Sequence, residues 1–345
     1  MSRKKLPKIN PKILEKPRLS KAGLSDLVNG IKQADRSIMG QALSLFESNK
    51  DEDVRMSRAL IDCFSENKTS KRIAITGVPG AGKSTFIEAL GEKLCNEGHK
   101  VAVLAIDPSS QKTGGAILGD KTRMEKLSRN PNAFIRPSSA GNVLGGIAKN
   151  TYQSILLCEA AGFDIILIET VGVGQSETIV QHMADFFLLL MLAGAGDELQ
   201  GIKRGIMELA DFVFINKAEE HNLVKAKEAM RQYKQALHLF QAKESSWKVK
   251  VEIGSALENT GLDLVWNGIK HFYKITSDNN YLSQYRQNQS IALFEYFLQE
   301  HILQDLETNK SFQSKKAKSR KGIISGNKNP FDEAKDLSQL WIKKT

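Results

Sequence analysis

The chain is poor in cysteine and has no long apolar run. Its 345 residues include three cysteines, Cys63, Cys95 and Cys158, which lie far apart and form no Cys-x-x-Cys pair. This pattern excludes a disulfide-stabilised scaffold, and we expect the cysteines to be small core residues. The longest apolar run covers residues 186–193, well short of the roughly 20 residues that a membrane-spanning helix needs.

Two targeting signals also lack support. Residues 1–21 contain no apolar stretch of the roughly 7–15 residues that a secretory signal requires. They are rich in lysine and contain three prolines, which does not favour a mitochondrial transit peptide. We therefore expect a cytoplasmic protein, or one of the mitochondrial matrix if the host is a eukaryote.

Acidic residues are scarce in two segments. The formal net charge of the chain is +10, from 49 Lys and Arg against 39 Asp and Glu. Residues 1–21 contribute +7 and residues 310–321 contribute +6, so the other 312 residues sum to −3. We expect flexible, solvated tails. A nucleic-acid or membrane adaptor is the alternative, although neither tail interleaves aromatic residues as single-strand binders do.

Apolar periodicity divides the chain into parts. Residues 22–70 have helical spacing and form a helical N-terminal extension, preceded by the basic flexible tail of residues 1–21. A P-loop domain is expected over residues 71–276. Residues 277–345 form a helical C-terminal extension with the basic tract, which we interpret as a dimerisation arm. Its strongest amphipathic helix carries Ile291, Phe294, Leu298, Ile302 and Leu306, and a short helix after the basic tract ends in Leu337, Leu340 and Trp341.

Short apolar runs alternate with helical patterns in the central part. Runs that are apolar at every position predict buried parallel strands, and helices between them predict right-handed crossovers. We therefore expect an α/β fold with a mostly parallel sheet covered by helices on both faces. The predicted strands are 73–76, 101–106, 165–168, 186–192, 212–215 and 249–253; the predicted helices are 84–97, 151–161, 176–184, 201–209, 222–240 and 261–275.

A phosphate-binding motif follows the first predicted strand and opens a helix. The segment GVPGAGKST, residues 77–85, matches G-x-x-x-x-G-K-[ST]. Its glycines let successive backbone N–H groups face a phosphate at the positive end of the helix. The motif predicts that the β- and γ-phosphates contact the lysine, Mg²⁺ the serine, and the α-phosphate the threonine. The predicted binding residues are Gly77, Val78, Pro79, Gly80, Ala81, Gly82, Lys83, Ser84 and Thr85.

Three acidic residues follow strands or lie in a glycine-rich loop. Asp107 and Glu169 end predicted strands, and Asp120 lies within residues 113–121. Ligands of open α/β sheets bind at the carboxyl edge, where these groups converge. With Ser84 they are the candidate ligands of Mg²⁺, which prefers oxygen.

A guanine-reading motif follows a later strand. Residues 216–219 read Asn-Lys-Ala-Glu, close to the Asn-Lys-x-Asp of GTPases, and Ser255, Ala256 and Leu257 resemble the loop that backs the guanine oxygen. Two positions differ from the usual pattern. Glu219 replaces Asp, which leaves an ATP-dependent enzyme open as an alternative, and Gly254 stands where Ser or Thr is usual.

These motifs together resemble one family, the MeaB/ArgK/MMAA P-loop GTPases. The resemblance runs from about residue 24 to residue 274, and a Glu in place of the usual Asp of D-x-x-G, here Glu169, is a hallmark of the family. The matching segments are GVPGAGKST at 77–85, DPSS at 107–110, GGAILGDKTRM at 114–124, IRPS at 135–138, ETVGVGQSE at 169–177 and GDELQGIKRG at 196–205.

The resemblance implies a slow GTPase that binds GTP, GDP and Mg²⁺. It also implies a G-protein chaperone of adenosylcobalamin-dependent methylmalonyl-CoA mutase, or of a related acyl-CoA mutase, and a homodimer. An older interpretation of the family is an ATPase or kinase serving lysine, arginine and ornithine transport. The implied catalytic residues are Lys83, Glu169 and Asp120, and the implied metal residues are Ser84, Asp107, Asp120 and Glu169.

Two further loops have implied roles in signalling nucleotide state. Val173 follows Gly172 where many GTPases place a water-orienting Gln, and the nearby Gln175 has no assigned role, so we expect a partner to complete the site. A γ-phosphate would order residues 107–121 and 169–175, and hydrolysis would release them. The polar members of the loop 194–203, which would relay this change to the partner, are Asp197, Glu198, Gln200 and Lys203.

Overall fold

The structure is a computed structural model. It describes residues 23–48, 50–64, 70–106, 124–136, 144–170, 177–193, 204–240 and 243–342.

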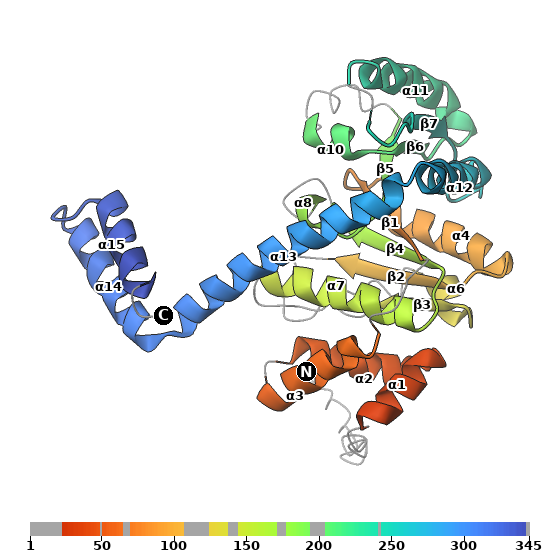
Figure 1. The fold of residues 1–345 in the computed structure, drawn as a ribbon. Helices are drawn as coiled ribbons and strands as arrows, with labels where there is room; N and C mark the ends of the chain where they lie inside the picture. The colour runs from red at the N-terminus through yellow and green to blue at the C-terminus, as the bar shows by residue number, and fades with distance from the viewer. Residues whose placement is uncertain are drawn as a thin grey trace, which may run out of the picture.

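A single seven-stranded parallel sheet forms the centre of the molecule (Figure 1). Its strand order is β3-β2-β4-β1-β5-β6-β7. The strands are β1 Lys71–Gly77, β2 Val101–Ile106, β3 Ala133–Arg136, β4 Ile165–Thr170, β5 Phe186–Leu192, β6 Phe212–Asn216 and β7 Lys250–Ile253. The six strands expected from the sequence are all present. The edge strand β3 was not predicted as a strand, because its residues, Ala-Phe-Ile-Arg, neither stay apolar to the end nor alternate between apolar and polar.

Helices cover both faces of the sheet, as the sequence predicted. Ile73 and Ile75 of β1 join the buried core beneath α4 and α12, whereas Ala74 joins the core shared with α7 and the N-terminal helices. This alternation follows from the two-residue period of a strand. The helices of this part are α4 Lys83–Asn96, α6 Glu125–Arg129, α7 Leu144–Ala160, α8 Glu177–Val180, α10 Arg204–Leu209, α11 Leu223–Leu237 and α12 Leu262–Asp278, with a 3-10 turn at Glu220–Asn222.

Three N-terminal helices pack on α7 as an additional layer (Figure 1). They are α1 Leu24–Lys32, α2 Arg36–Glu47 and α3 Asp51–Asp62. Asp35 begins α2 as its N-cap, accepting hydrogen bonds from the backbone N–H groups of Ser37 and Ile38 at 2.8 and 3.0 Å. The Arg36 guanidinium donates to backbone carbonyls just before and at the start of β3, including that of Ala133 at 2.7 Å. This contact anchors the layer to the sheet edge.

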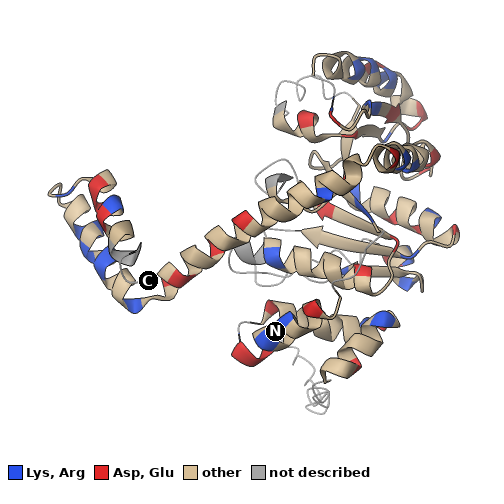
Figure 2. Ribbon diagram, in the orientation of Figure 1, with Lys and Arg blue, Asp and Glu red and all other residues tan. Residues whose placement is uncertain are grey.

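A long C-terminal arm leaves the body of the molecule (Figure 1). It consists of α13 Tyr281–Thr308, 28 residues long, followed by α14 Lys310–Ile324 and α15 Pro330–Ile342. The expectation that the basic tract 310–321 is a flexible tail is wrong, because this tract forms α14. Asn309 caps that helix by accepting a hydrogen bond from the Phe312 N–H at 2.9 Å. The cations of the tract lie on this helix in Figure 2.

The structure tests the expectations for the cysteines and for a membrane span, whereas the N-terminal tail lies outside the described residues. Cys95 and Cys158 are buried as expected, whereas Cys63 is exposed. Burial raises the pKa of the Cys95 thiol to about 11. No helix among the described residues is long and apolar enough to cross a membrane. The basic segment 1–21 lies outside these residues, and the division of the chain at 21, 70 and 276 stays a prediction.

A largely buried network of hydrogen bonds and one ion pair attaches α13 to the body of the molecule. The Arg286 guanidinium makes a bidentate contact with the Asp185 carboxylate, at 2.8 and 2.7 Å, and donates to the Ser70 carbonyl at 2.6 Å. The Tyr273 hydroxyl of α12 donates to the same carboxylate at 2.8 Å, and burial and this carboxylate hold the pKa of Tyr273 well above its usual range. Because Asp185 precedes β5 and Ser70 precedes β1, the network ties the arm to two central strands.

We expect Arg286→Ala to lower the free energy of unfolding by about 3 kcal/mol, because it removes one partner of a buried ion pair and leaves the other charge behind. Urea denaturation followed by circular dichroism measures this loss. The matched control is Arg231→Ala on α11, whose side chain is exposed and whose loss should change stability by less than about 0.5 kcal/mol. Equal midpoints for the two variants would contradict the assigned role.

Candidate nucleotide-binding site

The P-loop turn depends on two glycines that no other residue can replace without strain. Gly77 has φ +155°, and a Cβ placed there would lie 2.2 Å from the Leu190 carbonyl oxygen of β5. Gly82 has φ +83°, and its Cβ would lie 2.9 Å from the Asn216 Nδ2 atom. The turn therefore passes close to β5 and β6, and α4 begins directly after it.

Lys83 begins α4 and folds back over the turn. Its Nζ atom donates to the Gly77 carbonyl at 3.0 Å and lies 3.4 Å from the Val78 carbonyl. The ammonium group is thus held beside the same backbone that would surround a phosphate. The backbone N–H groups at the start of the 14-residue helix add positive potential at this point. This arrangement suits a polyphosphate.

Ser84 and Glu169 meet at the carboxyl edge of the sheet. The Ser84 hydroxyl donates to the Glu169 carboxylate at 3.1 Å, because β4, which carries Glu169, pairs directly with β1. One hydroxyl and one carboxylate oxygen in contact form part of the oxygen ligand set that Mg²⁺ prefers, so the described residues fit the metal. Asp107 and Asp120 lie outside the described residues, within which no group of three or more potential ligands gathers.

Asn216 joins the P-loop to the loop after β7. Its Nδ2 atom donates to the Ala81 carbonyl at 2.8 Å, and its Oδ1 atom accepts from the Ala256 N–H at 2.9 Å. The side chain is 2% exposed, so both bonds are shielded from water. Asn216 was predicted to contact the base, and the structure gives it this bridging position between the two loops.

The carboxylate of Glu219 is oriented by Ser255. The Ser255 hydroxyl donates to Glu219 Oε1 at 2.6 Å and accepts from the Glu258 N–H at 3.2 Å. Lys217 has φ +59°, and its Cε atom lies 3.8 Å from the Cβ position of Gly82, so its side chain runs beside the P-loop. Leu257 is 77% exposed. The predicted base-reading residues therefore come from two adjoining loops, as the motif requires.

The glycine at position 254 has a physical reason. A Cβ there would lie 2.3 Å from the Thr260 carbonyl oxygen and 2.8 Å from the Phe214 ring. The loop is closed by a bridge in which Ser255 and Thr260 exchange backbone hydrogen bonds of 3.2 and 2.9 Å. Gly254 therefore permits a tight loop that a Ser or Thr would open.

Sequence reasoning located these residues but missed how they contact one another. The Ser255–Glu219 bond joins side chains 36 positions apart, and the Asn216–Ala81 bond spans 135 positions. No local pattern reports such pairs. Several predicted residues lie outside the described residues: Gly172, Val173, Gln175, Asp197, Glu198, Gln200 and Lys203.

A glycine turn between a strand and a helix, a lysine over that turn and an adjoining Asn-Lys-x-Glu loop define a P-loop nucleotide-binding protein. The sequence model of the family described as "Methylmalonyl Co-A mutase-associated GTPase MeaB" matches residues 39–311. The chain belongs to this family and is a P-loop GTPase, which confirms the family resemblance.

Known proteins are similar to this chain in sequence over most of its length. It is 43% identical to "GTPase ArgK" of Escherichia coli (strain K12) over 295 residues, covering 85% of this chain and 89% of that protein. It is 38% identical to "Methylmalonic aciduria type A homolog, mitochondrial" of Mus musculus, covering 89% and 79%. A solved structure titled "Crystal structure of LAO/AO transport system kinase" matches with a TM-score of 0.75 and 35% identity, covering 93% and 98%.

We expect Asn216→Ala to weaken GDP binding by about tenfold or more, because it removes two buried hydrogen bonds that align the P-loop with the base-reading loop. Competition against a fluorescent guanine nucleotide measures the change. Asn222→Ala, which removes a bond to the Lys217 carbonyl at 2.9 Å, should have a smaller effect. Unchanged affinity in Asn216→Ala would show that the bridge does not position the nucleotide.

Proposed function

We propose that this GTPase is a G-protein chaperone of an adenosylcobalamin-dependent methylmalonyl-CoA mutase, or of a related acyl-CoA mutase, supporting its cofactor loading and protection. The observation that carries the proposal is the family match over residues 39–311, whose description names mutase association. The name of the mouse relative refers to methylmalonic aciduria, which is consistent with the same pathway.

The proposed reaction is attack of water on the γ-phosphate of GTP, giving GDP and phosphate. P-loop N–H groups and Lys83 would stabilise the charge that develops on the phosphate oxygens. Ser84 and Glu169 would hold Mg²⁺ together with Asp107 and Asp120, and Glu169 and Asp120 would also act in catalysis. Asn216, Lys217, Glu219 and the residues 255–257 would read the guanine.

Lys83→Ala and Ser84→Ala should each lower GTP turnover by about 100-fold or more, because each removes a group that contacts the phosphates or their metal ion. Release of inorganic phosphate from GTP measures the loss. The control is Lys93→Ala in the last turn of the same helix, which removes surface ion pairs with Glu97 and Asp263 and should leave turnover unchanged. Full activity in both site variants would refute the assigned roles.

The chaperone role requires a test with the partner. The chain and the mutase of the same host are mixed with GTP, and complex formation and retention of mutase activity during turnover are measured. We expect a complex, longer-lived mutase activity, and loss of this protection with Lys83→Ala. A GTPase-active chain that neither binds the mutase nor prolongs its activity would exclude the chaperone role while leaving the GTPase assignment intact.

One alternative has a specific observation in its favour. The solved structure of similar fold is titled as a transport system kinase, and Glu219 replaces the usual guanine-reading Asp. An ATPase or kinase linked to lysine, arginine and ornithine transport would bind ATP at least as well as GTP. Competition of the two nucleotides for the site decides between them, because the chaperone proposal expects GTP to be clearly preferred.

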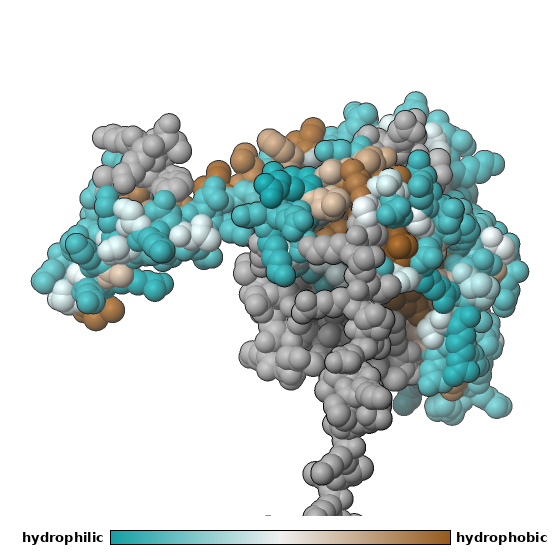
Figure 3. Space-filling model, turned by 90° about the horizontal axis from the view of Figure 1, so that it is seen from below, coloured by the Kyte–Doolittle hydropathy of each residue, from teal (hydrophilic) through white to brown (hydrophobic). Residues whose placement is uncertain are grey.

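We also propose that the arm forms a homodimer. One face of α13 carries apolar side chains at intervals of three and four residues, which are 45–65% exposed: Ile291, Phe294, Leu298 and Ile302. Figure 3 shows apolar side chains along the projecting arm. The opposite face packs on α7, where the Phe297 and Tyr152 rings are 5.9 Å apart. Residues 287–309 contain four acidic residues and no Lys or Arg, whereas α14 is strongly basic, so a second arm offers both apolar and charge complementarity (Figure 2).

Leu298→Asp should convert the dimer into a monomer, because it places a charge at the centre of the proposed apolar contact. Light scattering coupled to size-exclusion chromatography gives the molar mass. Gln304→Asp, an exposed position on another face of α13, should leave the dimer intact. A monomeric wild-type chain, or a dimer that tolerates Leu298→Asp, would exclude this interface.

A further inference from the structure

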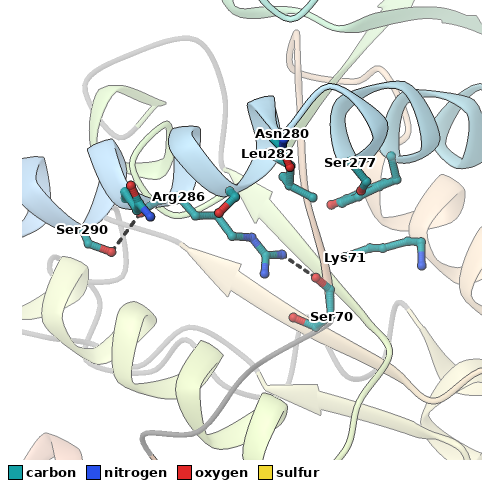
Figure 4. A pocket seen from close by; sticks show the side chains of 10 residues that line it. Ser70, Lys71, Ser277, Asn280, Leu282, Arg286 and Ser290 are labelled. Carbon is teal, nitrogen blue, oxygen red and sulfur yellow. Dashed lines mark hydrogen bonds between the residues drawn. The ribbon is translucent and has the colours of Figure 1, made fainter.

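A surface pocket lies at the amino edge of the sheet, where β1 begins and α12 passes into α13. Its volume is about 610 Å³. Figure 4 shows the lining side chains, which come from three segments; Lys71 and Arg286 lie at different places along the pocket, and the Lys71 side chain extends away from Arg286. The P-loop stands at the other end of β1, so the seven residues of that strand separate the two places by about 20 Å.

The lining of this pocket is positively charged. It includes Lys71 and Arg286 and no Asp or Glu. The charge of Arg286 is balanced from behind by Asp185, which also holds the guanidinium in one orientation. The Lys71 ammonium lies 5.5 Å from the centre of the Tyr273 ring, and no ion pair joins it to another residue in the described ranges. Lys71 therefore supplies uncompensated charge beside a rigid wall.

Neutral hydrogen-bonding groups complete the lining. The Ser277 and Ser283 hydroxyls and the Gln287 amide border the pocket. The first turn of α13 also borders it and has no acidic residue; the Tyr281 N–H of this turn donates to the Asn279 Oδ1 atom at 3.0 Å.

We propose that this pocket binds a small phosphate ester. A lysine acts as a point charge toward phosphate, and the phosphate's three oxygens would accept from Lys71, the serine hydroxyls and the start of α13. The remaining volume is bordered by the Tyr273 and Leu282 side chains as well as by Asn280 and Gln287, and this mixed wall suits a sugar, which has apolar faces and hydroxyl groups. The site differs from the nucleotide site and does not depend on the chaperone role.

Isothermal titration calorimetry tests the proposal on the full chain saturated with GDP, so that the P-loop cannot take up the probe. Ribose 5-phosphate should bind at one site per chain. Lys71→Gln should weaken its binding by about tenfold or more, because it removes a charge-assisted contact, whereas Lys71→Arg should retain binding. The control Lys227→Gln alters an exposed lysine on α11 and should match the wild type.

Two comparisons separate this site from non-specific attraction. Ribose, which lacks the phosphate, should not bind, and acetate should not displace ribose 5-phosphate at equal concentration. Lys71→Gln should keep the GTP turnover of the wild type, which shows that it is folded. Absence of binding to the GDP-loaded chain, equal binding by Lys71→Gln, or equal competition by acetate would each overturn the assignment.

Discussion

The parallel direction of all seven strands is the constraint on which the nucleotide site depends. Because every strand runs the same way, each carboxyl end reaches the same edge of the sheet. Gly77 at the end of β1, Glu169 on β4 and Asn216 at the end of β6 are thereby brought together from positions up to 139 residues apart. The crossover helices that this direction demands also cover both faces, which is why the strands are apolar at almost every position.

At that edge, side-chain hydrogen bonds between loops hold the site residues in place. Asn216 bonds both to the P-loop and to the loop after β7, and Ser255 holds the longer side chain of Glu219. Gly254 allows the close approach of Thr260 that gives this loop its shape. The two departures from the usual GTPase pattern thus lie in one hydrogen-bonded unit, where a longer carboxylate and a tighter loop occur together.

The arm is attached at the opposite edge of the sheet. The contacts of Arg286, Asp185 and Tyr273 fix the start of α13 against β1 and β5. The strand β1 therefore carries the P-loop at one end and helps to hold the arm at the other. The arm then extends beyond the body (Figure 1), with an apolar face that nothing in the described part of the chain covers. One sheet therefore connects the nucleotide site, the pocket at its amino edge and the proposed interface.

The sequence by itself determined the α/β class, six of the seven strands, the P-loop and the family, because each depends on local periodicity or a contiguous motif. It did not reveal β3, whose residues Ala-Phe-Ile-Arg show neither a fully apolar run nor an alternation, or the helix in the basic tract, whose charge resembles that of a solvated tail. Only the tertiary structure decided which side chains meet: Ser84 with Glu169, Ser255 with Glu219, and Arg286 with Asp185. The physical reason is that these pairs are set by strand order and helix packing, which act between residues 36 to 101 positions apart and leave no periodic trace in the chain.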